Sequence, residues 1–233
     1  MTNEPKIIIW DLEFFHINWG ADLGFILCMG WKELGKKTVH VESISDHNDG
    51  TWMDDGPLVD RCARILEQAD MWVTYNGIKC DVPFLQTRLL LNHKPLLPPV
   101  AHKDVYYTVR HKLKMSRSSL LAIQQAMESQ SKKTPVRLLQ WLKAVCKKDK
   151  KALAEIEEHC KNDVLVLEER YLELRPLLLS HPRLYGYGVC NKCGGELLKN
   201  KIYHTSSKQS KITLQCKSCR GYETRPLKER SRF

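Results

Sequence analysis

The sequence predicts an α/β domain with a mixed β-sheet, followed by a small C-terminal module organised around cysteines. Strand patterns come early in the chain and helical patterns later, with one helix between the third and fourth strands. This order is typical of a mixed sheet flanked by helices. Two C-x-x-C motifs follow the point where the helical pattern stops. We therefore expect two domains, covering residues 1–183 and 184–233.

Five segments carry strand patterns. The first is an apolar, β-branched run typical of a buried strand. A turn at Gly35 separates the second from the third, which predicts an antiparallel meander, and the fourth ends at the turn signal Asn76-Gly77. The segments are Lys6–Phe15, Gly24–Leu34, Lys37–Ile44, Asp70–Tyr75 and Val100–Val105.

Six segments carry helical patterns. Pro57 stands at a favoured first-turn position of the first helix, and Asp81 lies at or near the N-cap of the second. Pro135 and Pro176 fall in the later helical region, where prolines punctuate the pattern. The segments are Leu58–Gln68, Phe84–Leu91 and residues 105–114, 118–129, 134–147 and 149–179.

The composition is that of a globular protein. Of the 233 residues, 42% are hydrophobic and 27% are charged, which excludes disordered and fibrous classes. No apolar run reaches the roughly 18 residues that a membrane span requires, and the N-terminus lacks the features of a secretory signal. We expect a protein of the cytoplasm or another reducing intracellular compartment, neither secreted nor embedded in a membrane.

The positive charge is unevenly distributed. The formal net charge is +10, and residues 184–233, with eleven basic and three acidic residues, carry +8 of it. A nearly balanced first domain with a basic C-terminal segment indicates a polyanionic partner. A charged tail that only aids solubility is the alternative.

Four cysteines are arranged as two knuckles, Cys190-Asn-Lys-Cys193 and Cys216-Lys-Ser-Cys219, separated by 22 residues. Each C-x-x-C turn brings two thiolates to one ion, and two such turns complete a tetrahedron, as in a structural zinc ribbon. Two disulfides or a redox pair are alternatives, which the duplicated motif and a reducing compartment disfavour. We expect one structural Zn²⁺, and we expect the glycines after each knuckle (Gly194-Gly195 and Gly221) to allow the bends.

The segment around the cysteines has the residues of a nucleic-acid-binding surface. Basic side chains alternate with Tyr203, a combination that can hold phosphates and stack a base. Because zinc ribbons also dock proteins, a replication or repair protein is the alternative partner. The basic residues between and after the two knuckles are Lys199, Lys201, Lys208, Lys211, Arg220, Arg225, Lys228, Arg230 and Arg232.

Two acids stand in the otherwise apolar first strand. Asp11 and Glu13 are two residues apart, so in a strand both carboxylates face the same side. Their repulsion and desolvation are costly in a central strand. A divalent cation removes that cost, and carboxylates are ligands that Mg²⁺ and Mn²⁺ prefer. The pair therefore predicts a metal site.

Further acids fit the same picture. Asp81 lies where a strand leads through a turn into a helix, although an ordinary N-cap explains an aspartate there equally well. His159 and Asp163 are four residues apart, on one face of a helix. For that pair, a simple surface contact is the alternative.

Together, these motifs resemble the DEDD (DnaQ-like) 3′→5′ exonuclease superfamily. The shared order is Asp-x-Glu, then Asn-x₄-Asp followed by Val-Pro, then an aromatic residue or histidine four residues before a final Asp. The sequence is most similar to the proofreading domain of family B DNA polymerases and to YprB-type exonucleases. The resemblance covers about residues 6–175 and includes the stretch from His102 to Leu120.

The resemblance implies a ribonuclease H-like fold and a two-metal, 3′→5′ exonuclease that releases nucleoside 5′-monophosphates. Single-stranded DNA is the favoured substrate, with RNA as the alternative. Asn76 would position the strand, and Leu12 and Phe14 would flank its terminal nucleotide. The implied ligands of two Mg²⁺ or Mn²⁺ ions are Asp11, Glu13, Asp81 and Asp163.

The sequence departs from the family at His159. Members with tyrosine place it four residues before the last aspartate, and members with histidine place it five before; here histidine stands at the tyrosine spacing. A histidine is suited to act as general base, so we expect His159 to be catalytic. A structure-specific endonuclease and a non-catalytic nucleic-acid-binding adaptor are the alternative functions.

Overall fold

The computed structural model describes residues 4–47, 54–127, 136–178, 181–186, 188–204 and 210–227. The chain divides into two compact units. The larger is Lys6–Arg170, and the smaller comprises Met1–Pro5 and Tyr171–Phe233. Each unit is considered by itself below. The expected boundary between residues 183 and 184 stays a prediction.

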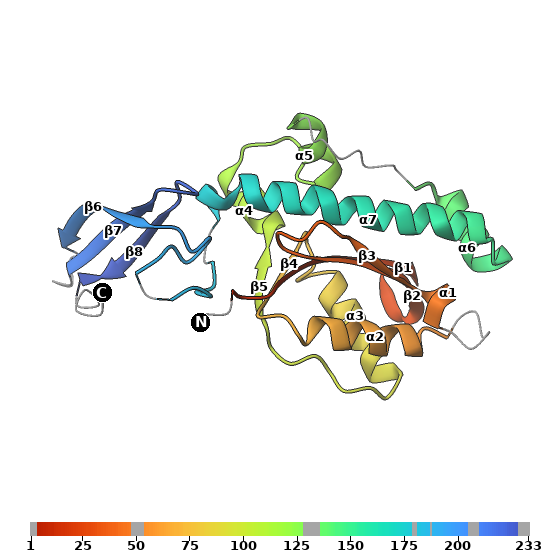
Figure 1. The fold of residues 1–233 in the computed structure, drawn as a ribbon. Coiled ribbons are helices and arrows are strands. Elements are labelled where there is room, and N and C mark those ends of the chain that lie inside the picture. Colours follow the sequence, from red (N-terminus) through yellow and green to blue (C-terminus); the bar gives the residue numbers. More distant parts are fainter. Residues whose placement is uncertain are drawn as a thin grey trace. The chain divides into compact units, whose positions relative to one another are not determined.

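The larger unit is built on a five-stranded sheet with the strand order β3-β2-β1-β4-β5. β1 pairs with β2, and β2 with β3, antiparallel, whereas β4 runs parallel to β1 and to β5. The expected mixed sheet is thus confirmed (Figure 1). The strands are β1 (Ile7–Ile17), β2 (Gly20–Glu33), β3 (His40–Ser43), β4 (Met71–Thr74) and β5 (Ala101–Asp104).

The hairpin between β1 and β2 is longer than the sequence predicted. Ile17 pairs directly with Gly20, and the two residues between them, Asn18 and Trp19, have φ angles of 52° and 62°. Positive φ at both central residues is the geometry of a tight two-residue hairpin turn. The predicted start of the second strand at Gly24 was wrong, because Asn-Trp lacks the glycine that usually marks such a turn.

Helices cover both faces of the sheet. Figure 1 shows α2 and α3 on one face and α7 on the other. The third strand was predicted to include Ile44, which instead begins the short helix α1, and the last helix ends at Glu173 rather than 179, before a 3₁₀ turn that contains Pro176. The helices are α1 (Ile44–His47), α2 (Gly56–Leu66), α3 (Asp81–Leu91), α4 (Val105–Lys112), α5 (Leu120–Ala126), α6 (Leu138–Lys147) and α7 (Lys150–Glu173).

One buried ion pair ties α2 and α3 to the sheet. Asp55 is completely buried and accepts hydrogen bonds from the backbone N–H of Ile26 at 2.8 Å and from Nη2 of Arg88 at 2.6 Å. Asn92 donates to the same carboxylate at 3.1 Å. Because these donors come from β2 and α3, the pair fixes the helix layer against the sheet.

The smaller unit contains a three-stranded antiparallel sheet in the order β6-β7-β8. The strands are β6 (Leu197–His204), β7 (Ser210–Cys216) and β8 (Tyr222–Pro226). The first cysteine knuckle precedes β6, and the second begins at the last residue of β7 and ends before β8. In the described ranges of both units, no helix has the length and apolar character needed to cross a membrane.

Candidate functional site

Three side chains from β1 and α7 meet on one face of the sheet. Nε2 of His159 lies 3.5 Å from Oε1 of Glu13, and Nδ1 of the same ring lies 3.9 Å from Oδ1 of Asp163. One ligand atom from each of the three residues lies within 4.8 Å of the others. The histidine and the last aspartate therefore share one face of α7 and lie beside Glu13.

Asp11 joins this group through a neighbouring thiol. One ligand atom each of Asp11, Glu13 and Cys160 lies within 4.8 Å of the others. Sγ of Cys160 donates to the backbone oxygen of Asp11 at 3.5 Å and lies 4.0 Å from its Oδ2. Cys160 is buried, and burial raises the pKa of its thiol well above the usual value. The protonated thiol is thus a hydrogen-bond donor beneath Asp11.

Asp81 comes from a different element, α3, and contacts the same strand, β1. It is the first residue of α3, with Cys80 at the N-cap, and it is 5% exposed. Its carboxylate accepts the backbone N–H of Leu12, the residue between the two strand acids. Burial raises the pKa of Asp81 to about 7, against the effect of these backbone hydrogen bonds. Asp81 belongs to neither of the two clusters described above, and its link to β1 is the contact with the Leu12 backbone.

Asp104 is a further acid, which was not among the predicted site residues. It ends β5, and its carboxylate accepts three backbone N–H groups, from Asn76 at 2.8 Å, Ile78 at 3.1 Å and Tyr106 at 3.0 Å. The first two bonds shape the loop that leads to Asp81. The charge of Asp104 also helps to raise the pKa of Asp81. An aspartate between a short strand and a helix was the signal that could have indicated it.

The acidic side chains described above suit divalent cations. The four carboxylates of Asp11, Glu13, Asp81 and Asp163 are hard oxygen ligands of the kind that Mg²⁺ and Mn²⁺ bind. Burial makes the ionised form of Asp81 costly without a positive charge nearby. The acidic group is therefore compatible with the divalent metals that ribonuclease H-like nucleases use.

The two residues predicted to flank the terminal nucleotide have different surroundings in the structure. Leu12 is 5% exposed and packs in the hydrophobic core, so only its backbone reaches the acidic group. Phe14 stacks on Phe84 with a centroid distance of 3.9 Å and lines a pocket of about 160 Å³. The lining residues are Phe14, Trp19, Ala21, Lys79, Cys80, Pro83, Phe84 and Thr87.

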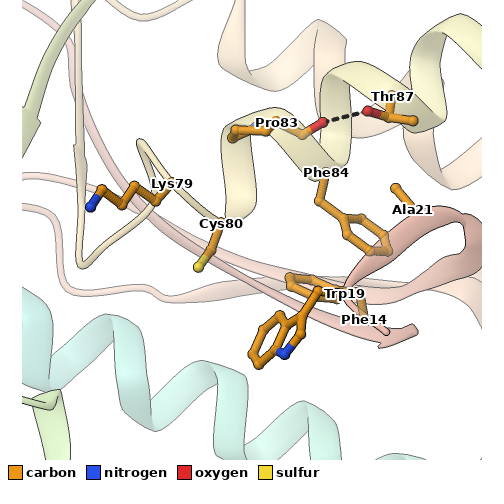
Figure 2. A pocket seen from close by; sticks show the side chains of 8 residues that line it. All are labelled: Phe14, Trp19, Ala21, Lys79, Cys80, Pro83, Phe84 and Thr87. Carbon is orange, nitrogen blue, oxygen red and sulfur yellow. Dashed lines mark hydrogen bonds between the residues drawn. The ribbon is translucent and has the colours of Figure 1, made fainter. Parts of the chain in front are cut away.

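Figure 2 shows the indole of Trp19 beside the rings of Phe14 and Phe84, with Cys80 and Lys79 toward the other end of the pocket. Trp19 is 73% exposed, because the hairpin turn carries it out from the sheet. Phe14 follows Glu13 and Cys80 precedes Asp81. The pocket is thus lined by residues that neighbour Glu13 and Asp81 in the sequence.

Asn76 borders a second, more polar pocket of about 400 Å³. Its φ of 64° is in the left-handed region, which an asparagine tolerates, and its Nδ2 donates to Sγ of Cys80 at 3.0 Å. The remaining wall contains an exposed guanidinium, aromatic rings and hydroxyls. The lining residues are Tyr75, Asn76, Tyr106, Arg110, Ser118, Ser119 and Leu120.

The four cysteines of the smaller unit form a compact cluster. All four sulfurs lie within 4.8 Å of one another, and the distance is 3.7 Å between Cys190 and Cys219 and 3.6 Å between Cys193 and Cys216. A tetrahedral Zn²⁺ with Zn–S bonds of about 2.3 Å would have sulfur–sulfur edges of about 3.8 Å. The cluster is thus consistent with a zinc ribbon.

The two knuckles turn in the same way but with different residues. The residue after each second cysteine has a positive φ: 72° at Gly194 and 62° at Arg220. The expectation that Gly221 supplies the bend of the second knuckle was wrong, because Arg220 takes the left-handed conformation there. A Cβ at position 221 would instead meet Nζ of Lys192 at 2.9 Å. A glycine at this position therefore leaves room for the Lys192 side chain.

The fold and the acidic side chains identify the protein as a ribonuclease H-like α/β protein with a candidate divalent-metal site. A family model described as the RNase_H superfamily matches residues 11–174. The chain belongs to this superfamily, and the ribonuclease H-like fold expected from the sequence is confirmed.

A solved structure supports the same fold. The family B DNA polymerase from the hyperthermophilic archaeon Pyrobaculum calidifontis superposes with a TM-score of 0.56 at 14% sequence identity. The match covers 74% of this chain but only 25% of the polymerase. A search of the curated protein sequences found no match.

Proposed function

We propose that the protein is a divalent-metal-dependent 3′→5′ exonuclease that degrades single-stranded DNA to nucleoside 5′-monophosphates. The observation that carries this proposal is the meeting of Glu13 from β1 with His159 and Asp163 from α7, beside Asp11 and Asp81. The four carboxylates, three of them from β1 and α7 and one from α3, match the charge of two Mg²⁺ or Mn²⁺ ions, which would stabilise the charge of an in-line phosphoryl displacement.

The histidine of this face has a position suited to proton transfer. Its two nitrogens face Glu13 and Asp163 at 3.5 and 3.9 Å. Two carboxylates beside the ring stabilise the positive charge that it gains when it takes a proton from the attacking water. His159 is therefore proposed as the general base, at a position where related families use tyrosine.

The neighbouring pockets suit a strand end. The pocket of about 160 Å³ is smaller than the roughly 300–1,000 Å³ of sites for drug-sized ligands, so it holds about one ring system. A terminal base stacked against Phe14 and Trp19 would place its phosphate at the acidic face. The polar pocket with Asn76 and Arg110 would receive the next part of the strand. A pocket for one base favours removal of terminal nucleotides over internal cleavage.

The cysteine cluster is proposed to hold one structural Zn²⁺. With four thiolates as ligands, no coordination position is left for a substrate. Binding of zinc requires thiolates rather than disulfides, which agrees with a reducing intracellular compartment.

End-labelled substrates test the proposal. The purified protein with Mg²⁺ or Mn²⁺ is incubated with 5′-labelled single-stranded DNA, duplex DNA and RNA. An exonuclease produces a ladder of single-nucleotide losses from the 3′ end, an endonuclease produces discrete internal fragments, and a binding protein produces neither.

Substitutions of the acidic residues test whether they form the active site. Asp11→Asn, Asp81→Asn and Asp163→Asn are each expected to lower the rate at least about 100-fold, since each removes charge at the reacting phosphate. Asp60→Asn, at an acid on the surface of α2, is the matched control and keeps the parent rate. Digestion by the Asp81→Ala protein as fast as by the parent would show that the assigned site is wrong.

A further inference from the structure

One face of the three-stranded sheet in the smaller unit is unlike the other. Along β7, Ile212, Leu214 and Cys216 are buried, whereas Lys211, Thr213 and Gln215 alternate with them on the opposite side. Successive side chains of a strand point to opposite faces. We call the side of Lys211, Thr213 and Gln215, with their cross-strand partners, the outer face.

The outer face carries exposed aromatic rings and lysines. Lys211 pairs with Tyr203, Thr213 with Lys201, and Gln215 with Tyr222. Directly paired residues share a face, so both tyrosines and both lysines lie on this one. Tyr203 is 36% and Tyr222 is 52% exposed. Such large rings on the surface of a small unit can serve as stacking platforms.

The acids of this region are placed elsewhere. In the described part of residues 184–233, Glu196 pairs with Lys217 at 2.6 Å and Glu223 pairs with the buried Arg225. Glu223 lies opposite Leu214 and therefore on the inner face. The charges of Lys201 and Lys211 consequently have no acidic counterpart on the outer face among the described residues. The face is positive, within a segment whose formal charge is +8.

We infer that the outer face binds single-stranded nucleic acid, with bases on Tyr203 and Tyr222 and phosphates on Lys201 and Lys211. Charge complementarity favours a polyanion, and the exposed rings favour unpaired bases, because bases within a duplex are already stacked. This inference goes beyond the proposed exonuclease activity, since the sheet bears none of the carboxylates of the candidate active site. It predicts a second binding site for the strand, separate from the site at which the phosphodiester bond is hydrolysed.

Binding is measured on the full-length, zinc-loaded chain that carries Asp81→Asn. The probe is a 5′-fluorescein-labelled oligothymidylate of about 20 nucleotides, followed by fluorescence anisotropy over a range of salt concentrations. Tyr203→Ala and Tyr222→Ala are each expected to weaken binding about 5- to 150-fold, the range for loss of one base–aromatic stack. Tyr203→Phe and Tyr222→Phe keep the ring and are expected to bind as the parent does.

The lysines are tested together. Lys201→Ala/Lys211→Ala is expected to lower the salt slope of log Kd by about 1.4, at about 0.7 per phosphate contact of a single strand. The matched control is Lys199→Ala/Lys217→Ala, which removes the same charge, because Lys199 lies opposite Leu214 of the inner face and Lys217 pairs with Glu196. Zinc content and circular dichroism establish that each variant is folded.

Four outcomes would overturn the inference. The tyrosine-to-alanine variants could bind as the parent does, or the control pair could weaken binding as much as the outer-face pair, which would indicate diffuse charge only. Duplex DNA could bind as tightly as the single strand, with no effect of the tyrosines. The outer-face variants could lose affinity for polyglutamate but not for the oligonucleotide, which would indicate an acidic protein partner. Absence of nuclease activity with intact outer-face binding would remove only the proposed exonuclease function.

Discussion

The backbone N–H of Gly30 donates a hydrogen bond to Sγ of Cys160 at 3.0 Å. This contact joins β2 to the helix that carries His159 and Asp163, across 130 positions of the sequence. A Cβ at position 30 would meet the backbone oxygen and Sγ of Cys160 at 3.0 Å and Cγ2 of Val164 at 3.1 Å. The close approach of strand and helix therefore depends on a residue that touches no ligand.

Gly30→Ala is expected to push α7 away from the sheet and so to separate His159 and Asp163 from Glu13. Overpacking of this kind costs about 1–3 kcal/mol of the free energy of unfolding, and we expect the rate of strand degradation to fall at least about 10-fold. Urea unfolding and a rate assay measure the two effects. Cys160→Ala in the same chain relieves one contact and should restore part of the activity. If the Gly30→Ala protein has the same stability and the same rate as the parent, Gly30 does not set the distance between the strand and α7.

His159→Ala is expected to lower kcat by about 10²–10⁴, the usual contribution of a general base, with KM changed less than about twofold. Because the exonuclease superfamily that the sequence resembles has members with tyrosine at this spacing, His159→Tyr should retain more activity than His159→Ala. Steady-state kinetics on a labelled single strand separate kcat from KM. A rise of KM alone would assign the ring to substrate binding instead.

Asp55→Ala is expected to lower the free energy of unfolding by about 3–5 kcal/mol, because it leaves the guanidinium of Arg88, only 14% exposed, without its charged partner. The control is Asp60→Ala on the same helix. That change removes an exposed i,i+4 pair with Arg64, which is worth at most about 0.5 kcal/mol. Denaturant titration compares the two variants. Equal losses would mean that burial does not decide the strength of these pairs.

The stability of the protein is expected to fall between about pH 6.5 and pH 4 through His102. Burial lowers the pKa of His102 to about 4, with the charge of Lys103 adding to the effect. An unfolded chain binds this proton near pH 6.5, whereas the folded chain does not, so acid favours the unfolded state in this range.

The variant His102→Gln should lose this part of the pH dependence, and His111→Gln, at an exposed histidine, should keep it. Free energies of unfolding measured across the pH range provide the comparison. If the parent and His102→Gln have the same slope between pH 6.5 and 4, the buried imidazole makes no contribution.

Cys193→Ser is expected to abolish binding of one equivalent of zinc and to remove hydrogen-exchange protection from β6, β7 and β8. Protection of β1 to β5 should remain, because those strands have their own core. Cys146→Ser is the control, since Cys146 is exposed and lies outside the cluster. Stoichiometric zinc in the Cys193→Ser protein would show that the four sulfurs are not the ligands.

Much of the architecture follows from local sequence patterns. Alternation with a period of two places Asp11 and Glu13 on one face of β1, and the i,i+4 spacing places His159 and Asp163 on one face of α7. The C-x-x-C turns bring their own thiolates together. Each of these signals acts over a few residues, so propensity and spacing are enough to detect it.

Other parts depend on contacts that no local pattern encodes. The hairpin turn at Asn18 and Trp19 follows from the pairing of Ile17 with Gly20, and it decides which aromatic ring reaches the pocket. Leu12 turns into the core because its neighbours in the strand face α7. Asp104 shapes the loop before Asp81 only because β5 lies beside β4.

By itself, the sequence determined the class of fold, the acids that share a face and the four cysteines of the cluster. The tertiary structure alone decided that β1 and α7 meet at one place, and that Cys160 of α7 contacts both Gly30 of β2 and Asp11 of β1 there. The physical reason is distance along the chain. Periodic patterns involve residues close together in the sequence. The meeting of β1 and α7 instead results from packing between elements more than 100 residues apart.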